Sequence, residues 1–565
     1  MDNRAGNGPG GSGSGGGRDR RKAFKKRLDA DESRRKREDQ LTQVRRERKE
    51  ESLKKKRWNG RARTGADEDG EHGDACARAE RKRFMVQYIP TLLANLRVRD
   101  PSRQLEALRQ FRKMLSVKDP PVDAVIGSGA VAFFLAFLKR DDLPQMQYEA
   151  AWVITNITSG SSEHTELVVR SGALPLLVRL LDRESPADGN DRDGIGKVKE
   201  QAVWALGNIS GDSWRLRDAT LDHGVMPPLL HTLLSSASSE GLLRNCTWLL
   251  GNLCRGKPPP RFERVRPCLE LGCFDRLLCV GDKEVVIDAC WALSYLSDGA
   301  DEEIQATIDA GVVPKLLEHV RVEDTEIVLP VLRTLGNIVT GSDVQTQYII
   351  DMGALSGIMN IFNHHSNHSI RKEACWTLSN ITAGNLDQIN AVIASGVVPF
   401  LVHMLADGEF RIKREAAWAI SNALSKGNHD HVDFLVQKCM CIKPMCDLLV
   451  CEDVKVINIL LEGIDNILKV GAAKVALSEQ RIDNPYVPMI DECDGIEKLE
   501  GLQQHENEEV YRKAMYILEE YMAAENEDEG TTAGFMPEQQ VDLQQGQYVF
   551  AGQTAANNGA IVFKF

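Results

Sequence analysis

The sequence contains no apolar run of about 18 residues, which is the length that a transmembrane helix needs. Its N-terminus is rich in glycine and then in basic residues, without the apolar segment of a secretory signal. The 13 cysteines are odd in number, and most lie in apolar stretches such as 288–291, as buried free thiols do in a reducing compartment. We therefore expect a protein of the cytosol or nucleus that does not contact membranes.

The sequence also lacks the motifs of common catalytic and cofactor sites. No Gly-x4-Gly-Lys-Ser/Thr occurs, and the glycine run at 10–17 precedes no strand–helix unit. Cys439, Cys441, Cys446 and Cys451 lack the paired Cys-x2-Cys units of structural zinc sites. No nucleophile and base stand in a recognisable arrangement. We predict no enzymatic activity, no cofactor and no metal.

Charge is distributed very unevenly along the chain. Residues 18–57 contain 19 Lys/Arg and 9 Asp/Glu, a balance of +10. The whole chain carries −12 and residues 1–17 are neutral, so residues 58–565 carry −22. A basic arm on an acidic body indicates that the arm binds the body, a separate partner, or both. By composition alone, residues 18–57 also fit a solvated tail or an arm that binds nucleic acid with a steep salt dependence.

One short pattern recurs through the acidic body: a Trp followed four residues later by an Asn, in apolar, Ala-rich segments. The pairs are Trp152/Asn156, Trp204/Asn208, Trp248/Asn252, Trp376/Asn380 and Trp418/Asn422. Residues four apart lie on one face of a helix, so each pair presents an indole beside a carboxamide. Incomplete copies place Lys113, Tyr295, Asn337 and Asn466 at the Asn position.

The copies follow one another at a nearly constant interval. Successive Asn positions are 42–44 residues apart except for one step of 52, which an acidic insertion at 183–194 explains. A Gly, an apolar residue, often a Pro, and then Leu-Leu precede each copy, as at 172–177 and 311–317, and predict the end of one helix and the start of the next. A period of about 40–47 residues is typical of armadillo and HEAT solenoids.

We therefore predict an all-α protein, an armadillo-repeat right-handed solenoid of about ten repeats. Residues 83–525 form the repeats, and the last of these, Gly495 to Met522, is degenerate. Residues 1–17 are Gly-rich and disordered, residues 18–60 form the basic arm, residues 61–82 are a linker, and residues 526–565 are a disordered tail.

The Trp–Asn pairs are predicted to face solvent. Core packing is the usual role of a Trp at helical spacing, but Ala151, Ile154 and Ile157 already supply an apolar stripe. Burying an Asn in every copy would require hydrogen-bond partners each time. Parallel indoles at the surface accept the stem of Lys or Arg, with a cation–π contribution of roughly 0.5–2 kcal/mol. Asn can bond a peptide N–H and C=O together, and nearby carboxylates would bind the ammonium groups: Asp212, Glu149, Glu373 and Glu415.

With these motifs the chain resembles the importin-α (karyopherin-α) family of nuclear import adaptors over about residues 18–525. The interruptions match too: Tyr295 follows Trp291 where an Asn is usual, and Arg333 precedes Asn337 where a Trp is usual. The resemblance implies a major site for nuclear localisation signals formed by Trp152, Asn156, Gly160, Thr165, Gln201, Trp204, Asn208, Asp212, Trp248 and Asn252. It implies a minor site formed by Arg333, Asn337, Gly341, Thr346, Trp376, Asn380, Glu415, Trp418 and Asn422. In the ninth copy Glu462 stands at the Trp position, and in the first copy Arg109 and Lys113 stand at the Trp and Asn positions. The series of complete pairs therefore ends before both ends of the solenoid.

The basic arm resembles the importin-β-binding domain of that family. Its clusters are Arg34, Arg35, Lys36, Arg37, Arg45 and Arg46, and Lys54, Lys55, Lys56 and Arg57 stand where the family has an autoinhibitory motif. The resemblance implies that the arm occupies its own groove at high effective concentration until importin-β removes it, and that cargo in turn favours importin-β.

The resemblance further implies an export factor at the C-terminal repeat, near Glu506, Glu508, Glu509 and 510–522, and shuttling between cytoplasm and nucleus. Contact with the nuclear pore would be indirect, and no direct nucleic-acid or membrane binding is expected. The alternative is an armadillo scaffold of the catenin type that joins adhesion or signalling proteins. Such scaffolds favour basic grooves for acidic partners, whereas this body is acidic.

Overall fold

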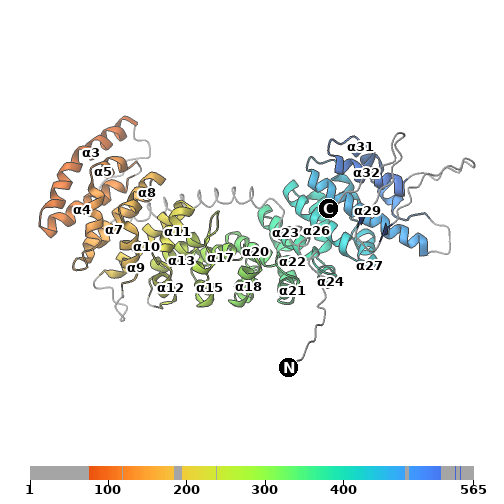
Figure 1. The fold of residues 1–565 in the computed structure, drawn as a ribbon, viewed down its shortest axis with the longest axis horizontal. Coiled ribbons are helices and arrows are strands. Elements are labelled where there is room, and N and C mark those ends of the chain that lie inside the picture. Colours follow the sequence, from red (N-terminus) through yellow and green to blue (C-terminus); the bar gives the residue numbers. More distant parts are fainter. Residues whose placement is uncertain are drawn as a thin grey trace, which may run out of the picture.

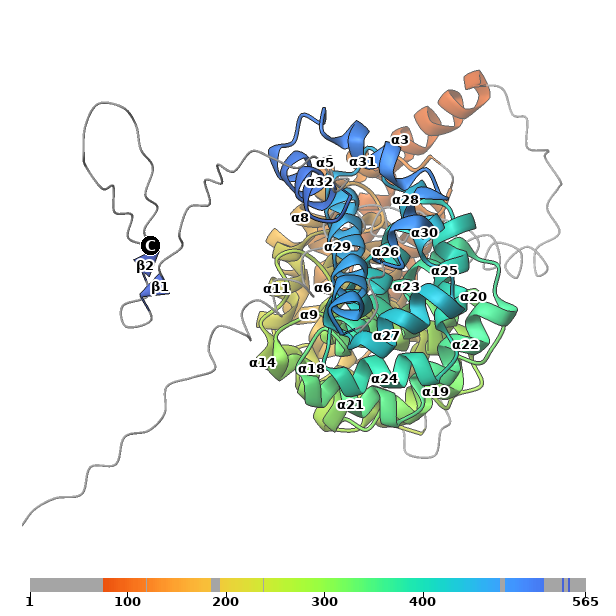
Figure 2. The same ribbon diagram turned by 90° about the vertical axis from the view of Figure 1, so that its right-hand side faces the viewer.

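A computed structural model describes residues 75–117, 119–183, 194–236, 238–477, 483–522, 541–542 and 547–548. Its helices follow one another in chain order along an elongated arc, from α3 (Ala75–Arg97) at one end to α32 (Glu508–Tyr521) at the other (Figure 1). Seen along the length of the arc, the helices of successive units overlap in one group, from which α3 projects (Figure 2). This arrangement is that of a solenoid, in which each unit packs mainly on its two neighbours.

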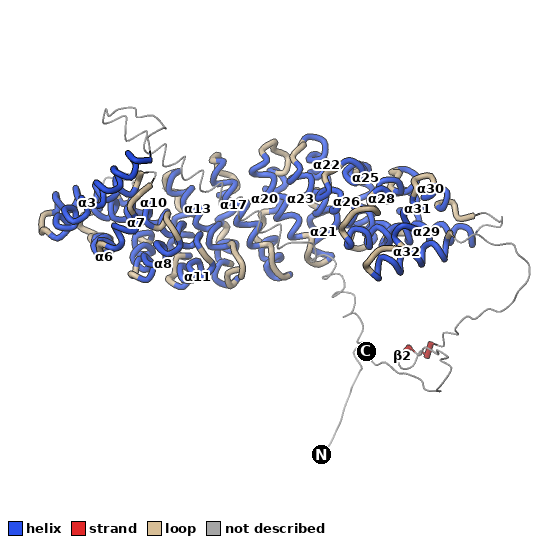
Figure 3. Tube along the Cα trace, turned by 90° about the horizontal axis from the view of Figure 1, so that it is seen from above, coloured by secondary structure: helices blue, strands red, loops and turns tan. Residues whose placement is uncertain are grey.

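Each full unit consists of a first, a second and a longer third helix. The third helices are α4 (Pro101–Leu115), α7 (Pro144–Ile157), α10 (Ile195–Asp212), α13 (Glu240–Cys254), α17 (Lys283–Leu296), α20 (Thr325–Ile338), α23 (His368–Thr382), α26 (Phe410–Lys426) and α29 (Val454–Leu477). Each packs on the third helix of the next unit. Viewed from above the arc, α10, α13, α17, α20, α23 and α26 form a row along its length (Figure 3).

The first and second helices are shorter. The first helices are α5 (Val122–Gly127), α8 (Ser162–Arg170), α11 (Trp214–Asp222), α14 (Phe262–Val265) with α15 (Pro267–Glu270), α18 (Asp301–Asp309), α21 (Asp343–Asp351), α24 (Leu386–Ala394) and α27 (His429–Asp433) with the π-helix η1 (Phe434–Lys438). The second helices are α6 (Ala130–Phe137), α9 (Ala173–Leu181), α12 (Met226–Leu234), α16 (Cys273–Leu277), α19 (Val313–His319), α22 (Ala354–His364), α25 (Val398–Asp407) and α28 (Ile442–Asp447). The last unit contains α30 (Val487–Asp491), α31 (Gly495–Leu502) and α32, and a short antiparallel pair, β1 (Val541–Asp542) and β2 (Gln547–Tyr548), follows.

Local sequence signals set the helix ends. Gly172 and Gly311 have φ of +89° and +71°, a conformation that only Gly adopts at little cost, and they separate the first helix of a unit from the second. Asp100, Asp282 and Asp324 accept hydrogen bonds from backbone N–H groups at the starts of third helices. Apolar side chains on the facing sides of the helices form one continuous core through the described repeats.

The structure confirms the predicted all-α armadillo solenoid, and its described residues form ten units. One boundary was wrong: α3 begins at Ala75, inside the segment 61–82 predicted as a linker. Alternating alanines at 75–79 favour a helix, which outweighs the acidic and Gly-rich residues just before them. The predicted arm at 18–60, the insertion at 184–193 and most of the tail at 526–565 lie outside the described residues.

The cysteine prediction is confirmed for most of the described thiols. Nine of the 12 thiols whose surroundings are described are buried, and none of the 12 is in a disulfide. No group of three or more metal-ligating side chains suited to an ion occurs among the described residues. Within the described helices none alone has the length and apolar character to cross a bilayer, and the only pair that qualifies together, α24 and α25, is bent by 81°.

Candidate functional site

Five third helices carry the Trp–Asn pairs, and we call the pairs together the Trp–Asn face. The pairs lie on α7, α10, α13, α23 and α26. Trp152, Trp248, Trp376 and Trp418 are half-buried, so part of each indole remains accessible. Trp204 is only 9 % exposed, contrary to the predicted solvent-facing indole, although it lies outside the continuous apolar core. Packing of each third helix on both neighbours covers the base of these rings.

The carboxamides differ more strongly from the prediction. Asn156, Asn252, Asn337, Asn380 and Asn422 are between 0 and 6 % exposed. The expectation of solvent-facing carboxamides was therefore wrong, and the reason lies in where their amide groups donate.

Five of the six amides donate to the preceding unit, and this offsets the cost of their burial. The Nδ2 of Asn208 lies 3.1 Å from the carbonyl oxygen of Thr155, and the Nδ2 of Asn252 lies 2.9 Å from that of Gly207. Asn337 and Asn422 likewise donate to the carbonyl oxygens of Ser294 and Ser379, and Asn156 donates to the Ser116 hydroxyl. Among the described residues, the Nδ2 of Asn380 has no acceptor. The Asn positions thus connect consecutive units as well as bordering the Trp–Asn face.

Glycines that precede the Asn positions make room for the indoles. A Cβ atom on Gly207 would overlap Cζ3 of Trp248, and one on Gly336 would overlap Cζ3 of Trp376. Each indole therefore rests against the backbone of the preceding unit. Sequence reasoning missed these two residues, although the repeated Leu-Gly-Asn at 206–208, 250–252 and 335–337 was the available signal.

We expect Gly336→Ala to push the Trp376 indole out of place and to lower the free energy of unfolding by about 1–3 kcal/mol, the usual cost of overpacking. Gly251→Ala is the matched control, because its Cβ would meet nothing closer than the Asp288 carbonyl oxygen at 3.7 Å. In the middle of α13 that alanine should stabilise the helix by up to about 1 kcal/mol. Urea unfolding monitored by Trp fluorescence measures both changes, and equal effects of the two substitutions would contradict this account.

Cations of this chain occupy the faces of two indoles. The guanidinium carbon of Arg112 lies 4.4 Å from the ring centroid of Trp152, and that of Arg333 lies 4.8 Å from the ring centroid of Trp376. Arg109 and Lys113 stand at the Trp and Asn positions of α4, and the neighbouring Arg112 is the residue that stacks on the first indole. Each stacked arginine belongs to the unit before that of its indole. In both cases the unit that carries the arginine lacks a complete Trp–Asn pair.

Two acidic residues that precede a Trp, Glu149 and Glu373, pair with cations of this chain. Glu149 pairs with Arg112 at 2.5 Å and with Arg109 at 3.6 Å. Glu373 pairs with Arg333 and, at 3.3 Å, with Lys372. The prediction that Glu149 and Glu373 stand open to bind a guest ammonium was therefore wrong, since pairing across the unit boundary buries both carboxylates.

Glu415 has a different electrostatic environment from its equivalents. Its carboxylate is 3.4 Å from Arg414, and burial raises its pKa to about 7 against the opposing effect of Arg414 and Lys372. The nearby Glu373 carboxylate adds to the rise. For Glu373, burial also pushes the pKa up, but Arg333 and Lys372 outweigh it and the pKa lies below its usual range. Glu415 is thus a buried acid that titrates near neutral pH.

Asp212 is the exposed carboxylate of the face. It is the last residue of α10, and its Oδ1 accepts a hydrogen bond of 2.8 Å from the hydroxyl of Ser162, the first residue of α8 in the same unit. Negative charge at a helix C-terminus adds to the partial negative charge of the helix dipole. Asp212 is therefore an accessible carboxylate at the end of a helix, which suits it to bind a cation.

Several other predicted residues lie beneath the face rather than on it. Thr165 and Thr346 are buried; the Thr165 hydroxyl donates to the Ser161 carbonyl at the start of α8, and the Thr346 hydroxyl donates to the Val339 carbonyl at the end of α20. Gln201 is buried against α13 and α7. Stacking of the units closes over these three side chains, and their part in the two sites stays a prediction. Gly160 and Gly341 lie at turns that precede first helices, Gly160 exposed and Gly341 half-buried.

The two halves of the face are separated by α17 and α20. On α17 the rings of Trp291 and Tyr295 stack with centroids 6.0 Å apart. On α20, Arg333 occupies the Trp position, and Asn337 keeps its bonds to Ser294 and Ser297. At the C-terminal end, Glu462 pairs with Lys513 of α32 at 2.8 Å, and Glu506, Glu508 and Glu509 are exposed around the start of that helix.

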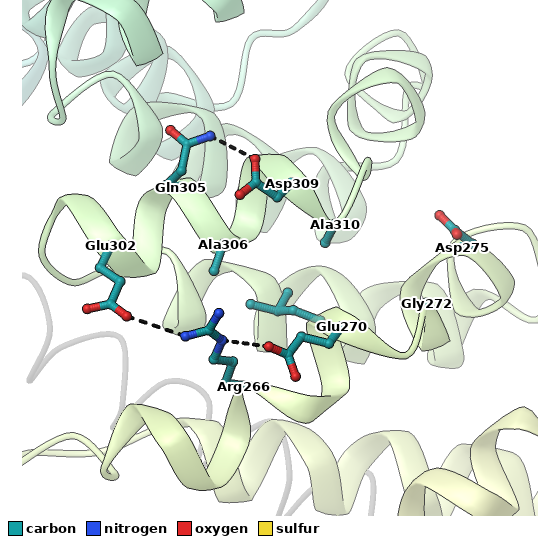
Figure 4. Close-up of a pocket in the computed structure, with 10 residues that line it drawn as sticks. Arg266, Glu270, Gly272, Asp275, Glu302, Gln305, Ala306, Asp309 and Ala310 are labelled. Atoms are coloured by element: carbon teal, nitrogen blue, oxygen red, sulfur yellow. Dashed lines mark hydrogen bonds and ion pairs between the residues drawn. The ribbon is translucent and has the colours of Figure 1, made fainter.

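A separate cavity of about 510 Å³ lies away from the Trp–Asn face, beside α15, α16 and α18. Arg266 crosses it between Glu270 at 2.7 Å and Glu302 at 3.4 Å, and Gln305 bonds Asp309 (Figure 4). None of the predicted site residues lines it.

The described residues thus define an armadillo-repeat protein whose third helices present paired indoles and carboxamides. Armadillo/beta-catenin-like repeats match residues 118–159, 215–255, 300–340, 342–383 and 385–425, and an atypical Arm repeat matches residues 484–535. An importin beta binding domain matches residues 20–109.

The chain is similar to importin subunit alpha-3 of Arabidopsis thaliana, with 45% identity over 92% of this chain and 94% of that protein. It is 47% identical to importin subunit alpha-1a of Oryza sativa subsp. japonica, over 90% of this chain and 93% of that one. An engineered protein of known crystal structure superposes with a TM-score of 0.66 at 25% identity, covering 76% of this chain and 98% of its own. This chain belongs to the importin-α family, and the membership supports a role as a nuclear import adaptor.

Proposed function

We propose that this protein binds the basic nuclear localisation signals of cargo proteins along its Trp–Asn face and links them to importin-β through residues 18–60. The observation that carries the proposal is the stacking of Arg112 over Trp152 and of Arg333 over Trp376, at 4.4 and 4.8 Å. The chain itself thereby supports the idea that these indole faces accept cations. Trp204, Trp248 and Trp418 would offer the same chemistry to Lys and Arg of a guest peptide.

The backbone of the guest would be held by the carboxamides. Because the Nδ2 of Asn208 donates to the preceding unit and this side chain is only half-buried, its carbonyl oxygen is the atom suited to accept a guest N–H group. This replaces the two-sided pairing expected from sequence. Asp212 would bind a Lys ammonium in the major site on α7, α10 and α13, and Glu415 would do so in the minor site on α23 and α26.

Electrostatics supports the same proposal. Residues 58–565 carry a net charge of −22, which attracts basic peptides and repels the acidic partners that a catenin-type scaffold would take. The match of residues 20–109 to an importin beta binding domain supports the assignment of the arm to importin-β. Such an adaptor would shuttle between cytoplasm and nucleus, and an export factor would bind near Glu506, Glu508 and Glu509.

Removing residues 1–60 tests both the peptide binding and the competition by the arm. We expect the shortened chain to bind a labelled basic signal peptide about ten- to a hundredfold more tightly than the full chain, because the tethered Lys54, Lys55, Lys56 and Arg57 no longer compete. Fluorescence anisotropy with both chains measures the ratio. Equal affinities would refute the competition, and no binding by either chain would refute the proposed function.

A matched control keeps the arm but removes its signal-like cluster. Replacing Lys54, Lys55, Lys56 and Arg57 by Ala should reproduce most of the gain seen after truncation. If only the truncation strengthens binding, some other part of residues 1–60 is responsible.

A further inference from the structure

A buried arginine holds the loop that follows α13. Arg217 of α11 is 1 % exposed. Its Nη1 donates to the carbonyl oxygens of Arg255 at 2.7 Å and of Pro258 at 2.8 Å, and its Nε donates to the Asp218 carboxylate at 2.9 Å. Withdrawing a guanidinium from water is costly unless its bonds are well satisfied. Arg217 therefore fixes the path of the chain from 255 to 258.

The loop is shaped around that arginine. Gly256 has φ of +115°, and a Cβ on it would lie 2.9 Å from the Nη1 of Arg217. Any other residue at 256 would be strained in the backbone and would press on the guanidinium. The 255–258 loop and the Arg217 side chain are thus packed tightly against each other.

From this loop the side chain of Arg255 reaches back to α10. Its Nη2 donates to the carbonyl oxygen of Gly211 at 2.6 Å. Carbonyls in the last turn of a helix lack an intrahelical N–H partner, and a cation suits that end of the helix dipole. Asn252 bonds the Gly207 carbonyl at 2.9 Å, one turn earlier. The turn that ends at Asp212 is therefore held by two side chains of the following unit.

We propose that Arg217 is a positioning residue for the Asp212 carboxylate, acting through the 255–258 loop and Arg255, and that it thereby sets the preference of the major site for a Lys ammonium. The inference rests on the proposed function, since it concerns how the same face recognises a basic peptide. A carboxylate recognises one ammonium well only when the groups around it hold it within about 0.5 Å of the binding geometry.

The test compares a single-cluster basic peptide with the same peptide carrying Ala in place of the Lys that faces Asp212. Fluorescence anisotropy on the full chain gives the ratio of the two dissociation constants, and Asp212→Asn defines the ratio without the carboxylate. We expect a ratio of about a hundred for the wild type, and at least a tenfold smaller ratio for Arg217→Met. Arg255→Ala should lower the ratio similarly without disturbing a buried residue, and Arg217→Lys should recover part of it.

The matched control is Arg276→Met. Arg276 makes the same kind of clamp between units, donating through Nη1 to the carbonyls of Leu233 at 2.7 Å and Ser235 at 2.5 Å, but it belongs to α16 and has no bond to α10 or α13 among those described. It should lower the melting temperature about as much as Arg217→Met and leave the Lys-to-Ala ratio at the wild-type value.

The outcomes separate the possibilities. If Arg217→Met and Arg255→Ala keep the wild-type ratio, or if Arg276→Met loses it equally, Arg217 is a structural clamp only and the inference is overturned. If the wild type binds neither peptide, the proposed function fails and the inference fails with it.

Discussion

Asp212→Lys is expected to weaken the binding of a single-cluster basic peptide by about a hundredfold, or roughly 3 kcal/mol. The carboxylate is exposed at the C-terminal end of α10 and is oriented by the Ser162 hydroxyl at 2.8 Å. The substitution removes an attraction and adds a repulsion at the point where the guest ammonium would sit. A peptide with two basic clusters should lose less, because its second cluster would still bind around Trp376 and Trp418.

Isothermal titration with both peptide types measures this difference. Asp309→Lys on α18 is the control, because it makes the same change in net charge beside the separate cavity near α15, α16 and α18. It should alter the affinity by less than about threefold, through long-range attraction alone. A similar loss in Asp212→Lys and Asp309→Lys would mean that net charge, rather than a site at Asp212, governs binding.

Glu415→Gln is expected to stabilise the protein above pH 7 and to weaken its minor site. Burial raises the pKa of Glu415 to about 7, above that of a carboxyl in an unfolded chain. From pH about 4.5 to about 7 the folded state therefore holds a proton that the unfolded state has lost, and the free energy of unfolding falls as pH rises through that window. Removing the buried charge should raise the free energy of unfolding by on the order of 1–3 kcal/mol at pH 8, and this increase should disappear towards pH 5.

Urea unfolding of wild type and Glu415→Gln at pH 5, 6, 7 and 8 measures that gain. Arg414 and Lys372 lower the pKa of the same carboxyl and Glu373 raises it, so the pH dependence of the difference reports burial together with these three charges. A stability difference that does not change with pH would contradict the assignment of the titration to Glu415.

The same residue should make the binding of an upstream cluster depend on pH. A guest ammonium stabilises the charged form of Glu415, so binding below pH 7 must release its proton. The affinity of a two-cluster peptide should rise by up to about tenfold from pH 6 to pH 8, and Glu415→Gln should abolish the rise. A single-cluster peptide bound around Asp212 is the internal comparison. Glu415→Arg should mainly harm the upstream cluster, and an equal loss for both peptide types would refute the separation into two sites.

Much of this architecture was predictable because its signals are local and repeated. Gly followed by Pro at helix junctions and Trp four residues before Asn each act within one or two turns of helix. These local signals return at a period of 42–44 residues. Nine marker positions and five complete Trp–Asn pairs reinforce one another, so the solenoid, the helices that carry the pairs and the interruptions at Tyr295 and Arg333 were all accessible from sequence.

The surroundings of the pairs were not predictable in the same way. Thr155, Gly207 and Ser379 accept from Asn carboxamides about 43–53 positions away. Arg333 and Glu373 meet across 40 residues. These contacts depend on the rise and rotation from one unit to the next, which no periodicity within a unit encodes.

By itself, then, the order of residues determined that the helices form, where they end and which side chains share a helix face, because those properties depend on neighbours a few positions away. Only the stacking of units decided that the carboxamides are buried, that Trp204 is nearly covered, that Arg112 lies on an indole, and that Asp212 remains exposed while Glu149 and Glu373 do not. The physical reason is that burial and pairing are set by the surface of the adjoining unit, which exists only once the chain has coiled.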